Sequence, residues 1–259
     1  MLSKIIEQKK FEVENLEEVV LDQPVIRRSL HSALAKPNRK IGLIAEVKKA
    51  SPSKGVIREN FEPLQIAKEY EETKADAISV LTDFTFFQGS IEYLMEIKKN
   101  VNLPILRKDF IIDSRQISQS EKMGADAILL IGEVLEPLKL YEFYCEAYER
   151  GMECLVEVHS RETLEQVCKY VTPKLLGINN RNLKNFITSI THTKEIIKDA
   201  PKESLVISES GIQSREDLDE IISYGAHATL IGEAFMRYKS PGRGIGKLLG
   251  EVNYETARH

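Results

Sequence analysis

The sequence predicts an α/β fold, a (β/α)8 TIM barrel with an N-terminal helical extension, on three observations. After about residue 42, eight short apolar segments recur, and longer segments of helical periodicity separate them. Strict alternation of strand and helix implies a parallel sheet, and eight strand–helix units in about 210 residues match this barrel. The alternation also continues almost to the end of the chain without a Pro/Ser-rich linker. We therefore expect a single domain over residues 1–259, in which residues 1–42 form the extension and residues 43–250 the barrel.

Each apolar segment is about five residues long and rich in Ile, Val and Leu, as expected for a strand that is buried on both faces. The segments are LIAEV from residue 43, AISVL from 77, PILRK from 104, AILLI from 127, CLVEV from 154, LLGIN from 175, LVISE from 205 and ATLIG from 228. A doubly wound α/β sheet would show the same alternation, but it usually has fewer strands. The number of segments therefore favours the barrel.

The segments between the predicted strands have the apolar periodicity of amphipathic helices. Examples are PLQIAKEYEETK, SIEYLMEIKKN, SRQISQSEKMG, EPLKLYEFYCEAYERG and SREDLDEIISYG. Gly and Asn commonly mark helix C-termini, and they stand at the ends of four of these segments, at Asn100, Gly124, Gly151 and Gly225. The periodicity and the end signals together predict a helix after most strands.

The N-terminal segment MLSKIIEQKKFEVENLEEVV is charged throughout and lacks the uninterrupted apolar region of a secretory signal. It has helical periodicity instead, with Leu2, Ile5, Ile6 and Leu16 on its apolar face. A barrel is closed by its last strand, so this extension is an addition to it. We expect the extension to cover the bottom of the barrel or to flank the rim of its functional face.

Composition excludes several classes of protein. The net charge of −4 does not suggest a nucleic-acid partner, and no apolar run approaches the roughly 18 residues of a membrane span. The three cysteines, Cys145, Cys154 and Cys168, are an odd number without a CxxC pair, so we expect reduced thiols in a cytoplasmic protein. The five histidines are dispersed, with no HxxxH or HxH spacing, so we expect no metal site.

Function in such a barrel lies at the C-terminal ends of the strands. Polar residues break seven of the eight apolar segments near that end: Glu46 and Lys48, Thr82 and Asp83, Lys108 and Asp109, Glu157 and His159, Asn179 and Arg181, Glu209 and Ser210, and Gly232 and Glu233. The segment AILLIG from residue 127 is the exception. The positions of these residues predict a polar site at the mouth of the barrel.

Five of the mouth residues are ionisable and carry both signs: Glu46, Lys48, Lys108, Glu157 and Glu209. Glu46 and Lys48 are two residues apart on one strand, so their side chains point to the same face. Inward polar residues of a small barrel can simply satisfy one another. Burying this many charges at one mouth is nevertheless costly unless they pair or serve a ligand. Mixed charges of this kind adjust each other's pKa values, which predicts acid–base chemistry.

Two glycine-containing turns suggest a phosphate site. SESGI over residues 208–212 and IGEAF over residues 231–235 follow the last two predicted strands, where barrels often bind phosphate through backbone N–H groups. Glycine lets the backbone approach the anion closely, although a tight strand-to-helix turn also uses it. Ser51, Ser53 and Lys54 of the first loop are placed to contribute from the opposite side.

Two aromatic residues, Phe87 and Phe110, fall in the loops after the second and third predicted strands. Aromatic side chains at this position either pack at the rim or hold a flat apolar group of a substrate. The residues by themselves leave both interpretations open.

The quoted segments, read together, identify a resemblance. EVKKASPSKG, ISVLTD with FFQGS, PILRKDFIID, GADAILLI, LVEVH, GINNRNL, SESGI and IGEAFM occur in this order between about residues 40 and 240 and resemble the indole-3-glycerol phosphate synthases of tryptophan biosynthesis. The resemblance implies a carbon–carbon lyase, a carboxy-lyase, that acts on 1-(2-carboxyphenylamino)-1-deoxyribulose 5-phosphate. The anthranilate carbon that bears the carboxylate attacks the sugar ketone, and CO2 and water leave. It also implies a monomer in the cytoplasm that needs no cofactor or metal.

The resemblance also implies roles for individual residues. Lys108 matches the catalytic lysine that acts as the acid at the ketone oxygen and later at the leaving hydroxyl. Lys48 matches the lysine that holds the substrate's carboxylate or phosphate and can deliver a proton. Glu157 matches the general base of the dehydration, and Glu46 would orient the lysines and balance their charge.

The remaining site residues are implied by the same motifs. Asn179 and Ser210 belong to the catalytic set, and they match substrate-binding positions of the family, as do Arg181 and Glu209. The phosphate-binding positions are Gly211, Gly232 and Glu233, with Ser51 beside them. Phe87 and Phe110 match the hydrophobic pocket for the anthranilate ring. Lys74 of ETKADA departs from the family, which commonly has Gly or another small residue there; at the bottom of the barrel it should affect stability and not chemistry.

Two alternatives remain open at this point. Another phosphosugar barrel enzyme, such as phosphoribosylanthranilate isomerase, works with a Cys/Asp acid–base pair and would not need the two lysines or Glu157. A non-catalytic barrel that only binds a phosphate ligand would have no reason to keep Glu46, Lys48, Lys108 and Glu157 together.

Overall fold

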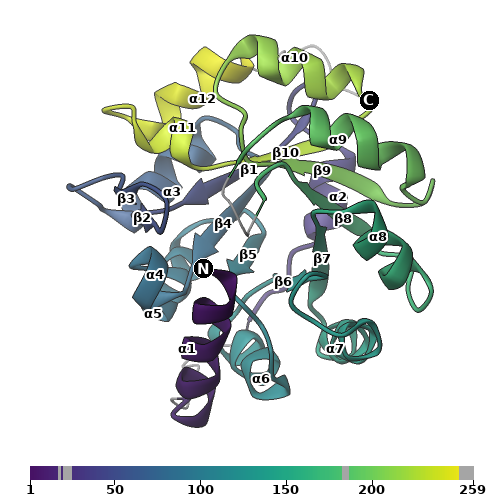
Figure 1. Cartoon of the computed structure of the whole chain (residues 1–259). Coiled ribbons are helices and arrows are strands. Elements are labelled where there is room, and N and C mark those ends of the chain that lie inside the picture. Colours follow the sequence, from purple (N-terminus) through teal and green to yellow (C-terminus); the bar gives the residue numbers. More distant parts are fainter. Residues whose placement is uncertain (17–18, 20–24, 183–186, 251–259) are drawn as a thin grey trace.

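The computed structural model describes residues 1–16, 19, 25–182 and 187–250. Eight parallel strands form a closed barrel in the order β1-β10-β9-β8-β7-β6-β5-β4, so the first strand pairs with the last (Figure 1). These strands are β1 (Gly42–Val47), β4 (Ala77–Leu81), β5 (Ile105–Lys108), β6 (Ala127–Ile131), β7 (Glu153–Val158), β8 (Leu175–Asn179), β9 (Leu205–Glu209) and β10 (Ala228–Ile231). The predicted (β/α)8 barrel is confirmed, and each predicted strand lies within one or two residues of its observed bounds.

Helices surround the barrel between successive strands. They are α3 (Pro63–Glu72), α5 (Ile91–Asn100), α6 (Ser114–Met123), α7 (Pro137–Glu149), α8 (Arg161–Cys168), α9 (Thr191–Ile196) with the 3-10 turn Ile197–Asp199, α10 (Arg215–Ser223) and α12 (Pro241–Leu249). Asn100 ends α5, and Gly124 caps α6 in the left-handed conformation. The sequence had not indicated a two-stranded hairpin, β2 (Ala50–Ser51) and β3 (Gly55–Val56), or the short helices α4 (Phe84–Phe87) and α11 (Glu233–Met236).

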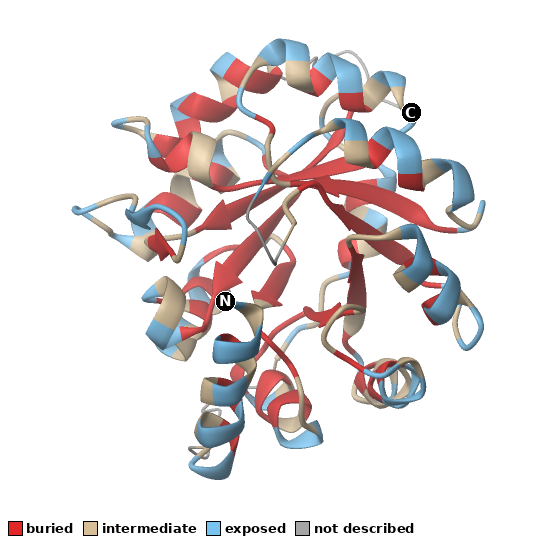
Figure 2. Cartoon of the chain, in the orientation of Figure 1, coloured by how far each residue is buried: buried red, intermediate tan, exposed pale blue. Residues whose placement is uncertain are grey.

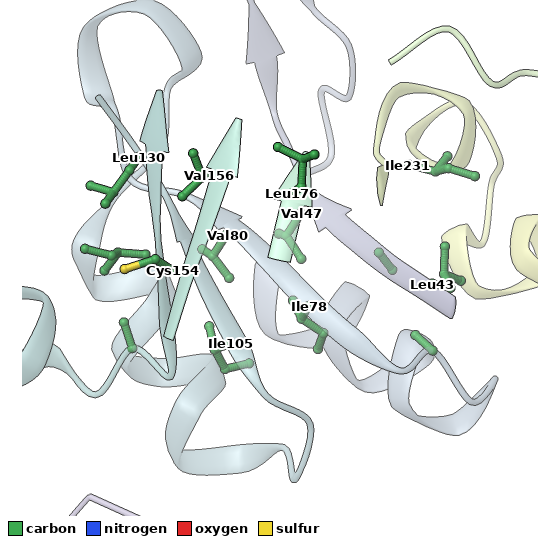
Figure 3. Close-up of a cluster of buried hydrophobic side chains, with 14 of the residues drawn as sticks. Leu43, Val47, Ile78, Val80, Ile105, Leu130, Cys154, Val156, Leu176 and Ile231 are labelled. Carbon is green, nitrogen blue, oxygen red and sulfur yellow. The ribbon is translucent and has the colours of Figure 1, made fainter. Parts of the chain in front are cut away.

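The apolar core has two layers because successive strand residues point to opposite faces. Ile44, Leu106, Leu155 and Ile207 point into the barrel, where they form one cluster with residues of the other strands. The outward-pointing residues form a second cluster against the helices, including Leu43, Val47, Ile78, Val80 and Val156 (Figure 3). The strands are therefore buried on both faces, while the helices expose their outer faces (Figure 2).

The N-terminal extension contacts both ends of the barrel. Helix α2 (Leu30–Ala35) covers the bottom, where Leu30 and Leu34 are buried beside the strand starts of the inner cluster. Helix α1 (Leu2–Glu14) lies at the mouth, and in the view of Figure 1 the N-terminus projects beside β4 and β5. The two expected positions are thus both occupied, by different helices. Leu16 was expected on the apolar face of this helix, but it lies beyond the end of α1. Val13 is the buried apolar residue near the C-terminal end of the helix.

A buried lysine attaches α1 to the barrel. Lys9 Nζ lies 2.9 Å from Asp83 Oδ2 and 2.8 Å from Asp109 Oδ1, in the loops after β4 and β5. Burial alone would lower the pKa of Lys9, but Asp109 and Asp83 outweigh burial and raise it. Arg107 completes the network by donating to Asp109 Oδ2 at 3.0 Å. Asp83 and Asp109, predicted as polar mouth residues, thus also hold the N-terminal helix.

Lys74, in the loop before β4, has a φ of 60° and therefore lies in the left-handed region. Its carbonyl accepts a hydrogen bond of 2.7 Å from the Arg39 guanidinium. The conformation explains why a small residue would suit this position. Within the described parts of the chain, no helix is long and apolar enough to cross a membrane.

Candidate active site

One cavity occupies the mouth of the barrel, at the C-terminal ends of the strands. It is lined by the fourteen residues that the resemblance assigned to the site: Glu46, Lys48, Ser51, Phe87, Lys108, Phe110, Glu157, Asn179, Arg181, Glu209, Ser210, Gly211, Gly232 and Glu233. Of the other polar residues predicted at the mouth, Asp83 and Asp109 line the cavity, whereas Thr82 and His159 do not. The parallel register explains this convergence, because every strand ends at the same edge of the barrel.

Lys108 lies at the centre of the ionisable group. At the end of β5, its Nζ donates to Glu157 Oε2 at 3.3 Å and to Glu209 Oε2 at 3.1 Å. The two carboxylates come from β7 and β9, and their side chains are almost completely buried. Burial alone would lower the pKa of Lys108, but the surrounding carboxylates, Glu209 and Glu157 foremost, outweigh burial and raise it. Lys108 is therefore a stably charged donor in the middle of the cavity.

Glu209 accepts a hydrogen bond from Lys108 at only one of its two carboxylate oxygens. Burial raises its pKa to about 8; Lys108 opposes this rise and Glu157 adds to it. Its Oε1 atom is buried and has no hydrogen-bond partner among the described residues. That oxygen lies against Gly177 of β8, where a Cβ atom would collide with it. Glycine at 177 therefore makes room for the carboxylate, a requirement that the sequence did not reveal.

Glu46 and Lys48 form a second pair at the end of β1. Lys48 Nζ lies 2.6 Å from Glu46 Oε1. Burial alone would raise the pKa of Glu46, but Lys48 and then Lys108 outweigh burial and lower it. Gly232 makes room for the Glu46 carboxylate in the same way that Gly177 makes room for Glu209. A Cβ at Gly232 would collide with Glu46 Oε1. The cavity thus contains two ion-paired groups, Lys48 with Glu46 and Lys108 with Glu157 and Glu209.

Asn179 orients Glu157. Its Nδ2 donates to Glu157 Oε1 at 2.9 Å, while its Oδ1 accepts from the backbone N–H of Arg181 at 3.0 Å. Because each end of the carboxamide has a partner of opposite kind, its orientation is fixed. Glu157 is therefore held from two sides, by Lys108 at one oxygen and by Asn179 at the other.

The turn after β9 is folded tightly at the edge of the cavity. Ser210 and Gly211 have φ values of 67° and 86°. The left-handed conformation is costly for a serine, and Asn180 stabilises it by donating to the Ser210 carbonyl at 3.0 Å. Ser51 of the hairpin in the first loop also lines the cavity. Its hydroxyl is buried without a hydrogen-bond partner in the described structure.

Arg181 spans the mouth between three loops. Its guanidinium donates to Ser53 Oγ at 3.1 Å and to Thr188 Oγ1 at 3.3 Å, and it lies 3.6 Å from Glu233 Oε2. Glu233 also pairs with Arg237 at 2.7 Å. Burial alone would raise the pKa of Glu233, but Arg237 outweighs it and the pKa is lowered. The Glu233 carboxylate is therefore occupied by arginines.

The apolar side of the cavity is formed by aromatic rings and by α1. Phe87 and Phe110 lie with ring centroids 6.3 Å apart, and both line the cavity. Leu2 and Ile5 of α1 line it as well. The amphipathic pattern of the N-terminus predicted that Leu2 and Ile5 would be apolar contacts, but the sequence did not place them in the cavity. Among the described residues, no three His, Cys, Asp or Glu side chains are grouped so as to hold a metal ion.

Comparison with known proteins identifies the family of the chain. A family model described as indole-3-glycerol phosphate synthase matches residues 2–248. The indole-3-glycerol phosphate synthase of Priestia megaterium is 56% identical over 254 residues, which are 98% of this chain and 99% of the relative. That of Bacillus pumilus is 55% identical over 251 residues, 97% of this chain and 100% of the relative.

Solved structures show the same fold at much lower identity. A 3-hexulose-6-phosphate synthase superposes with a TM-score of 0.63 at 13% identity, covering 82% of this chain and 100% of that one. An N-acetylmannosamine-6-phosphate 2-epimerase from Clostridium perfringens gives 0.61 at 13%, covering 83% and 93%. These likenesses show the barrel alone. The near full-length identity to the curated relatives decides the function, and the isomerase and the non-catalytic barrel are set aside. The chain belongs to the indole-3-glycerol phosphate synthase family and is a carboxy-lyase of tryptophan biosynthesis.

Proposed function

We propose that the mouth cavity binds 1-(2-carboxyphenylamino)-1-deoxyribulose 5-phosphate with its ring on the aromatic side and its phosphate at the opposite rim. Phe87 and Phe110 offer a flat apolar surface beside the barrel centre. The turn at Ser210 and Gly211, the backbone at Gly232 and Glu233, and the Ser51 hydroxyl offer donors to the phosphate. The sugar ketone then lies between the two ends, near Lys108.

The ring closure depends on Lys108 in this proposal. As the anthranilate carbon attacks the ketone, a C–C bond forms and negative charge develops on the ketone oxygen. The Lys108 ammonium stabilises that charge, and it transfers a proton because an alkoxide is far more basic than an amine. Loss of CO2 returns its electron pair to the ring. The observation that carries this assignment is the position of Lys108 Nζ between Glu157 and Glu209.

The dehydration uses Glu157 and Lys108 together. Glu157 removes the proton whose electron pair forms the new double bond of the five-membered ring. Lys108, which takes up a proton from solvent after ring closure, donates it to the hydroxyl, which leaves as water. Asn179 keeps Glu157 Oε1 in place for this step. Lys48, paired with Glu46, holds the substrate carboxylate or phosphate. Arg181 is positioned to add a second cation when substrate replaces its contacts across the mouth.

We also propose that the chain works as a cytoplasmic monomer without cofactor or metal. Each group assigned a role comes from the same chain, so the proposed site does not require a second copy. Activity that falls on dilution, together with sedimentation as a dimer, would contradict the monomer.

The roles of the two lysines are tested by single-turnover kinetics. The chain has no Trp, so the fluorescence of the indole product rises above a dark protein background. Lys108→Ala should stop ring closure, so neither product nor the closed-ring intermediate forms. Lys48→Ala should weaken substrate binding and still allow the closed-ring intermediate to appear. Equal accumulation of that intermediate in both variants would refute the division of roles.

A further inference from the structure

His159 lies behind the catalytic residues, just beyond the end of β7. Its ring Nδ1 is 2.7 Å from the backbone carbonyl of Asn179, at the end of the neighbouring strand β8. The last ladder pair between these strands joins Val158 and Ile178. The ring therefore continues the connection of β7 and β8 for one further residue. His159 is not among the residues that line the catalytic cavity.

His159 is itself held in place at its backbone and at its ring. The backbone N–H of His159 donates to Glu133 Oε1 at 2.7 Å, and Glu133 lies in the loop after β6. The His192 ring of α9 stacks on the His159 ring with centroids 4.3 Å apart, and its Nε2 bonds to the His159 carbonyl. The two hydrogen bonds hold the His159 backbone, and the stacked His192 ring packs against the His159 side chain.

The chemistry of the contact fixes the tautomer of His159. A backbone carbonyl only accepts hydrogen bonds, so Nδ1 must carry a proton and donate it. Burial lowers the pKa of the His159 ring, and the Asn179 hydrogen bond opposes this shift. In the neutral ring the second nitrogen, Nε2, is the acceptor.

The contacts form a closed circuit at the ends of two strands. Glu157 lies on β7 and His159 follows two residues later, just beyond the end of the strand. His159 holds the Asn179 backbone, and the Asn179 carboxamide holds Glu157. We propose that His159 is a positioning residue, which acts through Asn179 to aim the Glu157 carboxylate at the substrate. This inference rests on the roles proposed above for Glu157 and Asn179. It gives a function to a histidine that lies outside the cavity.

The test replaces the donor and keeps the stacking. His159→Phe retains a ring against His192 and removes the Nδ1–H group. We expect kcat for indole formation to fall about ten-fold, the effect of one lost positioning hydrogen bond, with KM changed less than about two-fold. His159→Asn places an amide N–H near the position of Nδ1 and should restore kcat to within about two-fold of the wild type. His159→Gln carries the same amide one methylene too far and should not restore it.

The Asn179→Ala background shows whether His159 acts through Asn179. In that background the further change His159→Phe should leave single-turnover rates unchanged, because the carboxamide that His159 orients is absent. Three results would each overturn the inference: wild-type kcat in His159→Phe, equal kcat in His159→Asn and His159→Gln, or an undiminished effect of His159→Phe in the Asn179→Ala background. If His159→Phe does not fold, the Asn and Gln pair decides the question.

Glu157→Gln, measured in parallel, separates this inference from the proposed reaction. Wild-type turnover in Glu157→Gln would refute the role of Glu157 itself. An inactive Glu157→Gln together with a fully active His159→Phe would refute only the positioning by His159.

Discussion

Glu209 Oε1 lies so close to the place that a Cβ of residue 177 would take that the neighbouring strand must have glycine, Gly177, at that point. The carboxylate of β9 and the glycine of β8 thus depend on each other, and the relationship can be tested. Gly177→Ala should move Glu209 away from Lys108, lowering the free energy of unfolding by about 1–3 kcal/mol and turnover by about ten-fold or more. Urea unfolding and fluorescence assays measure the two effects.

Gly246 of α12 provides the matched control for this change. A Cβ at Gly246 would contact nothing within 4 Å. Gly246→Ala should therefore stabilise the helix by about 0.5–1 kcal/mol and leave turnover as it is. Similar stability losses in both variants would argue that loss of glycine alone, and not the contact with Glu209, is responsible.

Glu209 should also make stability depend on pH. Its pKa is raised from 4.5 to about 8 in the folded chain. Between these values the folded state binds more protons than the unfolded state, so this contribution is complete below pH 4.5 and is lost as the pH rises toward 8. Glu209→Gln cannot titrate, so its free energy of unfolding relative to the wild type should increase across that range. Parallel pH profiles of urea unfolding would contradict the shift.

Lys74 should be replaceable by glycine with a gain in stability. A lysine at a φ of 60° is strained, and glycine adopts this conformation freely, so Lys74→Gly should raise the free energy of unfolding by about 1 kcal/mol. Lys68 of α3 has a helical backbone and is the control. Lys68→Gly should lower the free energy of unfolding by a similar amount. Turnover should change in neither variant. Destabilisation by Lys74→Gly would mean that its side chain matters more than its backbone.

Replacing Lys9 should change both the free energy of unfolding and the KM for substrate. Lys9→Met leaves Asp83 and Asp109 buried without their shared cation, so we expect a loss of about 3 kcal/mol in the free energy of unfolding. KM should rise, because Leu2 and Ile5 of the same helix line the cavity. Exposed Lys10 is the control, and Lys10→Met should change neither quantity beyond the error of measurement. An unchanged KM in Lys9→Met would show that α1 is held without this lysine.

The barrel and the residues of its mouth were predictable because both follow from local patterns. Buried parallel strands appear as continuous apolar runs, and charges at their ends must meet because the strands share one direction. Lys9 was not predictable in the same way. A lysine in a charged N-terminal helix is usually solvated, and only the tertiary structure brings it to Asp83 and Asp109.

Glu133 and Gly177 were missed for related reasons. The segment AILLIG has no polar residue at its end, and Glu133 comes just after it, with its carboxylate turned toward the backbone of the next loop. Gly177 appears in the sequence as an ordinary strand glycine, and its role depends on a carboxylate that lies on another strand. Pairings between distant strands determine both functions, and periodicity carries no information about such pairings.

The attachment of α1 through Lys9 also affects the order in which the chain can assemble during translation. The helix is synthesised before its buried partners Asp83 and Asp109. Strand β1 likewise lacks one neighbour until β10, the last strand of the barrel, has been synthesised. The nascent chain must therefore carry a detached helix until the loops after β4 and β5 are made, and an unpaired strand edge until β10 is made, which makes this interval the time of greatest exposure to aggregation.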